Sequence, residues 1–172
     1  YKVEVRELGE RLGIPRELLW RHPFPGPGLG VRLLCNRGEP DRAGFEDAEP
    51  ALARAARKLG LQALLLPIRS VGVKADLRAF EHPVLLTGEA PWDALILAAS
   101  AVTKEVPRVN RCIWNLSSEH PTRATPLAAT VTRKRLDVLR EADAIVMAAP
   151  RPHGHHSVIS QCPTERVPPR IL

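Results

Sequence analysis

The sequence has few aromatic residues, few cysteines and no long apolar run. Phe, Trp and Tyr make up 4% of the 172 residues, which argues against a base-stacking platform for nucleic acid. Its three cysteines are too widely spaced for a disulfide framework or a zinc module, which fits a reducing, cytoplasmic setting. No apolar run approaches the roughly 18 residues of a membrane-spanning helix, so we expect no membrane partner. Neither the Gly-x-x-x-x-Gly-Lys-Ser/Thr loop nor the Gly-x-Gly-x-x-Gly fingerprint is present.

The composition is that of a folded and basic chain. Hydrophobic residues make up 44% and charged residues 26%, and the formal net charge is +6. A basic balance favours anionic partners such as nucleotides, or it reflects an arginine-rich solvated surface. A nucleic-acid-binding domain rests on this charge alone and predicts binding that weakens steeply with salt; we expect no nucleic-acid partner. Both ends look cut, so we expect a piece of a longer protein.

Five segments are predicted to be helical. Val5, Leu8 and Leu12 predict a first helix, and a short helix follows through Trp20. Leu52 to Leu59 carries apolar residues at i, i+3, i+4 and i+7 and ends at Gly60. The last two predicted helices cover residues 91–105 and 132–148.

Between these helices, short apolar segments predict strands. They cover residues 30–35, 63–68, 70–74, 78–86 and 111–116, and Pro83 indicates an edge strand or a bulge. His82 and His120, each before a proline, are expected in loops, and Cys35 and Cys112 in the core. Because some strands follow one another directly, we expect an α+β fold with a small mixed or antiparallel sheet packed with helices.

The least usual stretch is Arg21-His22-Pro23-Phe24-Pro25-Gly26-Pro27-Gly28-Leu29. Each proline fixes its own φ, and glycines allow close backbone approach, so such a loop can hold N–H groups toward an anion. Arg21 and His22 would add side-chain donors. A stiff linker or a proline-rich ligand for another domain explains the composition equally well.

A second stretch places a carboxylate between two strands. Asp76 is flanked by Arg69, Lys74 and Arg78. It could accept hydrogen bonds from a nucleoside, or it could form an Asx-turn in an ordinary hairpin. His153, His155 and His156 lie in a Pro-Gly loop without a nearby cysteine or carboxylate, and we expect no metal site there.

Several of these segments resemble glutamine-hydrolysing GMP synthase, in its long, eukaryote-like form. The proline-glycine stretch at 21–29 matches a signature of that family, and Leu65 to Asp76 matches its Leu-Pro-Ile-Arg-Ser-Val-Gly-Val-x-Gly-Asp segment. Tyr1 to Gly9, Val109 to Cys112, residues 136–143 and Ile159 to Pro163 resemble further family segments in the same order.

The resemblance implies a function. The family amidates xanthosine monophosphate (XMP): ATP adenylates the xanthine oxygen, and ammonia made from glutamine then displaces AMP to give GMP. Residues 1–30 would be the end of the ATP-pyrophosphatase domain with its linker, and residues 31–172 a partial C-terminal dimerisation domain, so we expect a homodimer. By motif, Asp76 and Gln161 would contact XMP, with Arg21, His22, Pro25, Gly26, Pro27 and Gly28 in a loop beside the nucleotide pocket.

The chain also departs from the family pattern. Val3 replaces an Asp, and Ala75 replaces the Gly before Asp76. The amidotransferase triad and the Ser-Gly-Gly-x-Asp-Ser pyrophosphate loop are missing, so the resemblance assigns no catalytic residue to this segment. It leaves ATP and Mg²⁺ to the missing pyrophosphatase domain, and we expect that this chain alone does not make GMP. The alternative is an inactive self-association module left by gene truncation.

Overall fold

The computed structural model describes residues 1–20, 29–74, 77–149 and 169–171. The chain divides into two compact units, Tyr1–Leu33 with Val131–Arg166, and Leu34–Thr130 with Val167–Leu172. The helices are α1 (Lys2–Arg11), α2 (Arg16–Leu19), the 3-10 turn η1 (Leu29–Arg32), α3 (Phe45–Lys58), α4 (Trp92–Glu105) and α5 (Arg133–Ala148). The strands are β1 (Gln62–Leu65), β2 (Ser70–Lys74), β3 (Leu77–Thr87), β4 (Val109–Trp114), β5 (Ala124–Pro126) and β6 (Pro169–Ile171). The expected α+β fold is confirmed.

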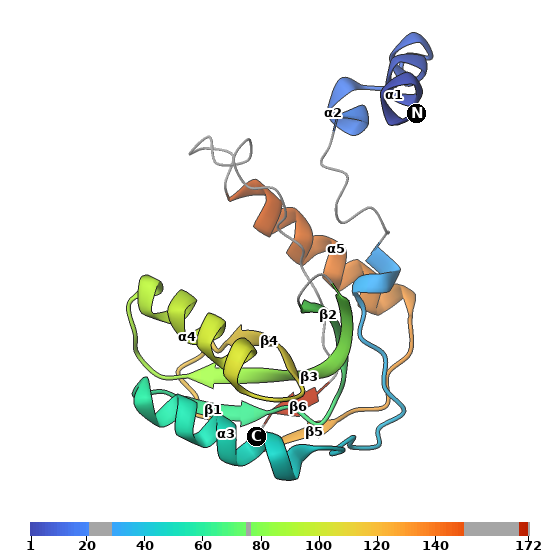
Figure 1. Ribbon diagram of the computed structural model, residues 1–172. Helices are drawn as coiled ribbons and strands as arrows, with labels where there is room; N and C mark the ends of the chain where they lie inside the picture. Colours follow the sequence, from blue (N-terminus) through green and yellow to red (C-terminus); the bar gives the residue numbers. More distant parts are fainter. Residues whose placement is uncertain (21–28, 75–76, 150–168, 172) are drawn as a thin grey trace. The chain divides into compact units, whose positions relative to one another are not determined.

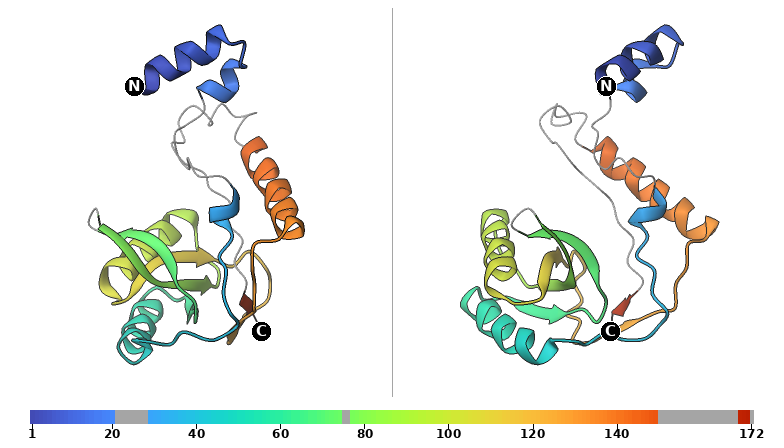
Figure 2. Two further views of the ribbon diagram at one scale, coloured as in Figure 1. Left: turned by 90° about the vertical axis from the view of Figure 1, so that its right-hand side faces the viewer. Right: turned by 45° about the vertical axis from the view of Figure 1, so that its right-hand side comes forward.

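β3 is the central strand of a four-stranded mixed sheet. Its first half pairs antiparallel with β2, and its second half pairs antiparallel with β1 and parallel with β4. Figure 2 shows β3 as one long, curved strand. The pairing with β4 shifts register between His82 and Pro83. Of the two predicted alternatives, an edge strand or a bulge, the structure shows the bulge, and the shift accommodates the missing N–H of Pro83 inside the sheet.

The two faces of this sheet are covered differently. Alternate residues such as Val84 and Leu86 lie with Leu52 of α3 and Ala98 of α4, and Figure 1 shows both helices on the same face of the sheet. Leu85, between them in sequence, belongs to a smaller cluster on the other face, with Ala124 of β5 and the half-buried Leu34. This period-two alternation is what a sheet between two apolar layers requires.

Local sequence accounts for the helices that cover the sheet. α3 carries Glu46 and Asp47 in its first turn and Arg57 and Lys58 in its last, which complements the helix dipole. It starts at Phe45, earlier than the apolar spacing predicted, and Gly60 follows its end at φ +66°.

The other unit contains α1, α2, η1 and α5. The Thr132 side chain caps α5 by accepting a hydrogen bond from the Arg135 backbone N–H. The predicted strand at 30–35 is wrong: Leu29–Arg32 forms a 3-10 turn, and Arg32 pairs with Asp143 of α5 at 2.6 Å. The first residues of this segment therefore pack on α5 as a helical turn.

Truncating a residue of the larger core tests this arrangement. Leu86 is 2% exposed, so Leu86→Ala is expected to lower the free energy of unfolding by about 2–5 kcal/mol in urea titrations. Leu97→Ala on α4 is the matched control, because that side chain is 68% exposed and its loss should change stability by no more than about 0.5 kcal/mol. Equal effects would contradict the assigned core.

Candidate functional site

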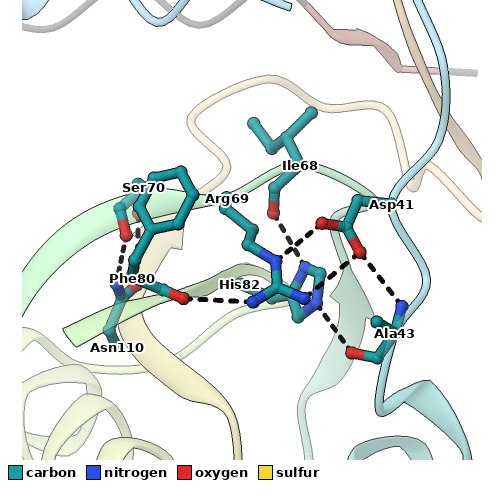
Figure 3. A network of polar contacts seen from close by, with 8 residues as sticks. All are labelled: Asp41, Ala43, Ile68, Arg69, Ser70, Phe80, His82 and Asn110. Atoms are coloured by element: carbon teal, nitrogen blue, oxygen red, sulfur yellow. Dashed lines mark hydrogen bonds and ion pairs between the residues drawn. The ribbon is translucent and has the colours of Figure 1, made fainter.

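The segment Leu65 to Lys74 and the start of β4 meet in the structure, although some 40 residues separate them in sequence. Both segments carry part of the resemblance described above. The Asn110 side-chain amide of β4 donates to the Ser70 carbonyl oxygen at 2.5 Å and to the Ala79 carbonyl oxygen at 3.1 Å. The Ser70 hydroxyl donates back to the Asn110 side-chain oxygen at 3.1 Å (Figure 3). Ser70 is fully buried, so one amide satisfies polar groups from both strands of a hairpin.

Gly72 explains why a glycine stands in this motif. A Cβ at Gly72 would lie 2.8 Å from the Asn110 Cβ and 3.0 Å from its Cγ. The glycine therefore lets the Asn110 side chain approach the β2 backbone closely enough to make its hydrogen bonds.

Arg69, directly before Ser70 in the motif, forms an ion pair with Asp41. The Arg69 guanidinium donates to both Asp41 carboxylate oxygens, at 2.6 and 3.4 Å, and to the Phe80 carbonyl oxygen at 3.4 Å. The hydrogen bond from Arg69 holds the pKa of the Asp41 carboxyl below its ordinary value, and the carboxylate in turn raises the pKa of Arg69. Both side chains keep some solvent contact, so the pair contributes little to stability.

His82 is the polar residue that the sequence interpretation placed wrongly. Instead of a loop, it lies in β3 and is 1% exposed. Its Nδ1 is 2.8 Å from the Ile68 carbonyl oxygen and its Nε2 is 3.2 Å from the Ala43 carbonyl oxygen. Its ring also meets the Phe45 ring edge-on at 5.0 Å. Figure 3 shows His82 joining the segment before α3 to the segment between β1 and β2.

The two cysteines within the described residues differ in exposure. Burial raises the pKa of the Cys112 thiol to about 11, so this thiol is protonated at neutral pH and is not a nucleophile. Cys35 is exposed, so its predicted place in the core is wrong.

Within the part of the chain that the structure describes, no group of three or more His, Cys, Asp or Glu side chains is arranged to hold a metal ion. Over the same residues, no helix is long and apolar enough to span a bilayer.

The two residues predicted to contact XMP and the six predicted in the loop beside the nucleotide pocket lie outside the described residues. They are Asp76, Gln161, Arg21, His22, Pro25, Gly26, Pro27 and Gly28. In the sequence, Asp76 follows the end of β2 at Lys74 and precedes the start of β3 at Leu77, and its predicted contact with XMP stays a prediction. The role of Asn110 was missed. Its only signal was membership of a family-like segment, because its partners are distant in sequence.

The larger unit is thus an α+β unit. In it, the motif segment Leu65 to Lys74, the central strand β3 and the start of β4 are joined by the hydrogen bonds of Asn110. No family model matches the chain. It is 38% identical over 140 residues to the glutamine-hydrolysing GMP synthase of Syntrophomonas wolfei, a match that covers 70% of this chain and 28% of the relative. The corresponding synthases of Geobacillus kaustophilus and Symbiobacterium thermophilum are 36% and 39% identical, again over 70% of this chain, and over 28% and 27% of their own lengths. This chain is therefore homologous to a part of GMP synthase and spans little more than a quarter of these relatives.

Acid titration tests the ion pair. Because the pKa of Asp41 is lowered from the ordinary 3.8 in the folded state, its contribution to stability is present above that value and is lost as pH falls through the lowered pKa. Asp41→Asn should therefore cost less than about 1 kcal/mol at pH 7. It should also reduce the loss of stability that follows as pH falls through and below 3.8 in denaturant titrations. Glu89→Gln, which changes an exposed carboxyl, is expected to leave that acid loss as in the wild type.

Filling the space at Gly72 tests the close approach. Gly72→Ala should lower the free energy of unfolding by about 1–3 kcal/mol, because Asn110 is held by its hydrogen bonds and cannot yield freely. Gly30→Ala makes the same chemical change where no atom lies within 4 Å, and it should be neutral or stabilising by up to about 1 kcal/mol. Chemical denaturation measures both, and a harmless Gly72→Ala would refute the packing argument.

Proposed function

We propose that this chain is a segment of a GMP synthase that supplies part of the XMP-binding site and contacts for self-association. The observation that carries the proposal is the meeting of two family-like segments, Leu65 to Lys74 and the start of β4, in one hydrogen-bonded platform. Identities of 36–39% to GMP synthases support the same reading. The ligase chemistry, a place in purine biosynthesis and a cytoplasmic location come with this proposal.

The contacts that we assign to XMP are polar. Asp76 stands in the connection of the β2–β3 hairpin, and its carboxylate suits ribose hydroxyls or a base N–H. The Gln161 carboxamide offers both donors and an acceptor to a base edge. Residues 21–28, with Arg21 and His22 as donors, would lie beside the pocket.

The chemistry itself belongs to parts of the synthase that this chain lacks. The loop that would bind the pyrophosphate of ATP, with its Mg²⁺, and the residues that release ammonia from glutamine are not in this sequence. The chain would act by completing the XMP site of a longer or assembled enzyme, in the long, eukaryote-like arrangement. Ala75, which stands in place of a glycine, adds a Cβ beside the carboxylate.

The second candidate is a catalytically inactive module that only self-associates. Exposed apolar side chains on α4, namely Trp92 at 69% and Ile96 at 54%, favour it, because they stand one turn apart on the same side of the helix, and single-chain surfaces rarely group such residues without a contact role. Sedimentation of the chain with and without XMP separates the two candidates, since only the first predicts a ligand.

Thermal unfolding with and without XMP tests the proposal. At about 100 times its dissociation constant, a ligand stabilises the folded state by about 2.7 kcal/mol, which at this size raises Tm by roughly 5–10 °C. The shift should disappear in Asp76→Ala and persist in Asp93→Ala, which removes an exposed carboxylate from the start of α4. A wild-type chain that melts cooperatively without a shift would remove the XMP proposal for this segment and leave the self-association module.

A further inference from the structure

The first half of β3 and its partner β2 form a two-stranded ribbon, residues 70–74 with 77–81. Beyond it, from Val84 to Thr87, β3 lies between two other strands. The register shift between His82 and Pro83 stands where the ribbon begins. A bulge of this kind bends a strand, and a two-stranded ribbon has little stability of its own. The direction of the ribbon therefore depends on what holds its base.

Asn110 holds that base from both strands. Its amide nitrogen donates to the Ser70 oxygen of β2 and to the Ala79 oxygen of β3, and its oxygen accepts from the buried Ser70 hydroxyl. All the hydrogen-bonding atoms of one side chain are thus used on one hairpin. A side chain without two donors and an acceptor cannot replace it without leaving buried polar atoms unsatisfied.

A second contact runs in the same direction. The Arg111 guanidinium donates to the Val71 carbonyl oxygen at 2.7 Å, but that contact is exposed to solvent. The absence of a side chain at Gly72 lets Asn110 sit directly on the ribbon. Two neighbouring residues of β4 therefore fix the ribbon, and the half-buried Asn110, with three hydrogen bonds, carries the larger share.

We propose that Asn110 is a positioning residue for XMP: it sets the direction of the ribbon formed by β2, the end of the family-like segment Leu65 to Lys74, and the first half of β3. This inference rests on the proposed function. From the Ser70–Glu81 pair to the Lys74–Leu77 pair the ribbon extends about 13 Å, so a rotation of about 10° at its base moves its far end by roughly 2 Å. Errors of about 1 Å in placing a ligand-contacting group are enough to weaken its action severely.

The test separates positioning from stability. Asn110→Ala removes all three hydrogen bonds, and Asn110→Asp keeps the shape but replaces the two donors by an oxygen. Val102→Ala is the control, because this fully buried residue of α4 affects stability without touching the ribbon. XMP affinity is measured by calorimetry at a temperature where every variant is folded, together with amide hydrogen exchange of the unliganded chain.

Both Asn110 variants should weaken XMP binding by at least about tenfold, and Val102→Ala by less than about twofold despite its lower Tm. Amides of the ribbon should exchange at least about tenfold faster relative to the β1–β3 amides in the Asn110 variants only. Asn110 variants that bind XMP as well as Val102→Ala does would overturn the inference and leave the proposed function standing. A wild-type chain that does not bind XMP would overturn both, and unchanged ribbon exchange would by itself refute the structural part.

Discussion

The burial of the second half of β3 is the constraint on which the larger unit depends. From His82 to Thr87 every residue is buried, with β1 on one side and β4 on the other. Both faces of a strand in this position must be apolar and covered. α3 and α4 cover one face, and β5 with the segment around Leu34 covers the other. Each of these elements is placed by its contact with this short stretch.

The polar contacts around the ribbon lie next to the point where this buried stretch of β3 begins. Where its burial begins, His82 reaches two backbone carbonyls and the register shift redirects the strand. Asn110 is then placed by the parallel pairing of β4 with β3. The fold thus supplies a rigid base, and the family-like segment Leu65 to Lys74 uses it to present a hairpin connection.

Much of the fold could be predicted from periodicity, and much of the site could not. The apolar spacing at Leu52 to Leu59 and the short apolar segments gave helices and strands near their observed positions. The strand predicted at residues 30–35 was wrong because a short apolar run does not distinguish a strand from a 3-10 turn that packs on a helix. The prediction that His82 lies in a loop was wrong because the carbonyl oxygens that contact its ring belong to residues 14 and 39 positions away in the sequence. The predicted nucleotide contacts at Asp76 and Gln161 stay predictions, since they depend on residues outside those described.

The parallel pairing of β4 also sets an order of assembly. The two strands of the ribbon meet across a short connection, so they pair within microseconds once both exist. β4 follows only after the chain has passed through α4, and its contacts with Ser70 span 40 residues. Contacts of such separation form late, and a ribosome releases the ribbon before Asn110. Because the ribbon has little stability of its own, it becomes a fixed element of the fold only when β4 arrives with Asn110.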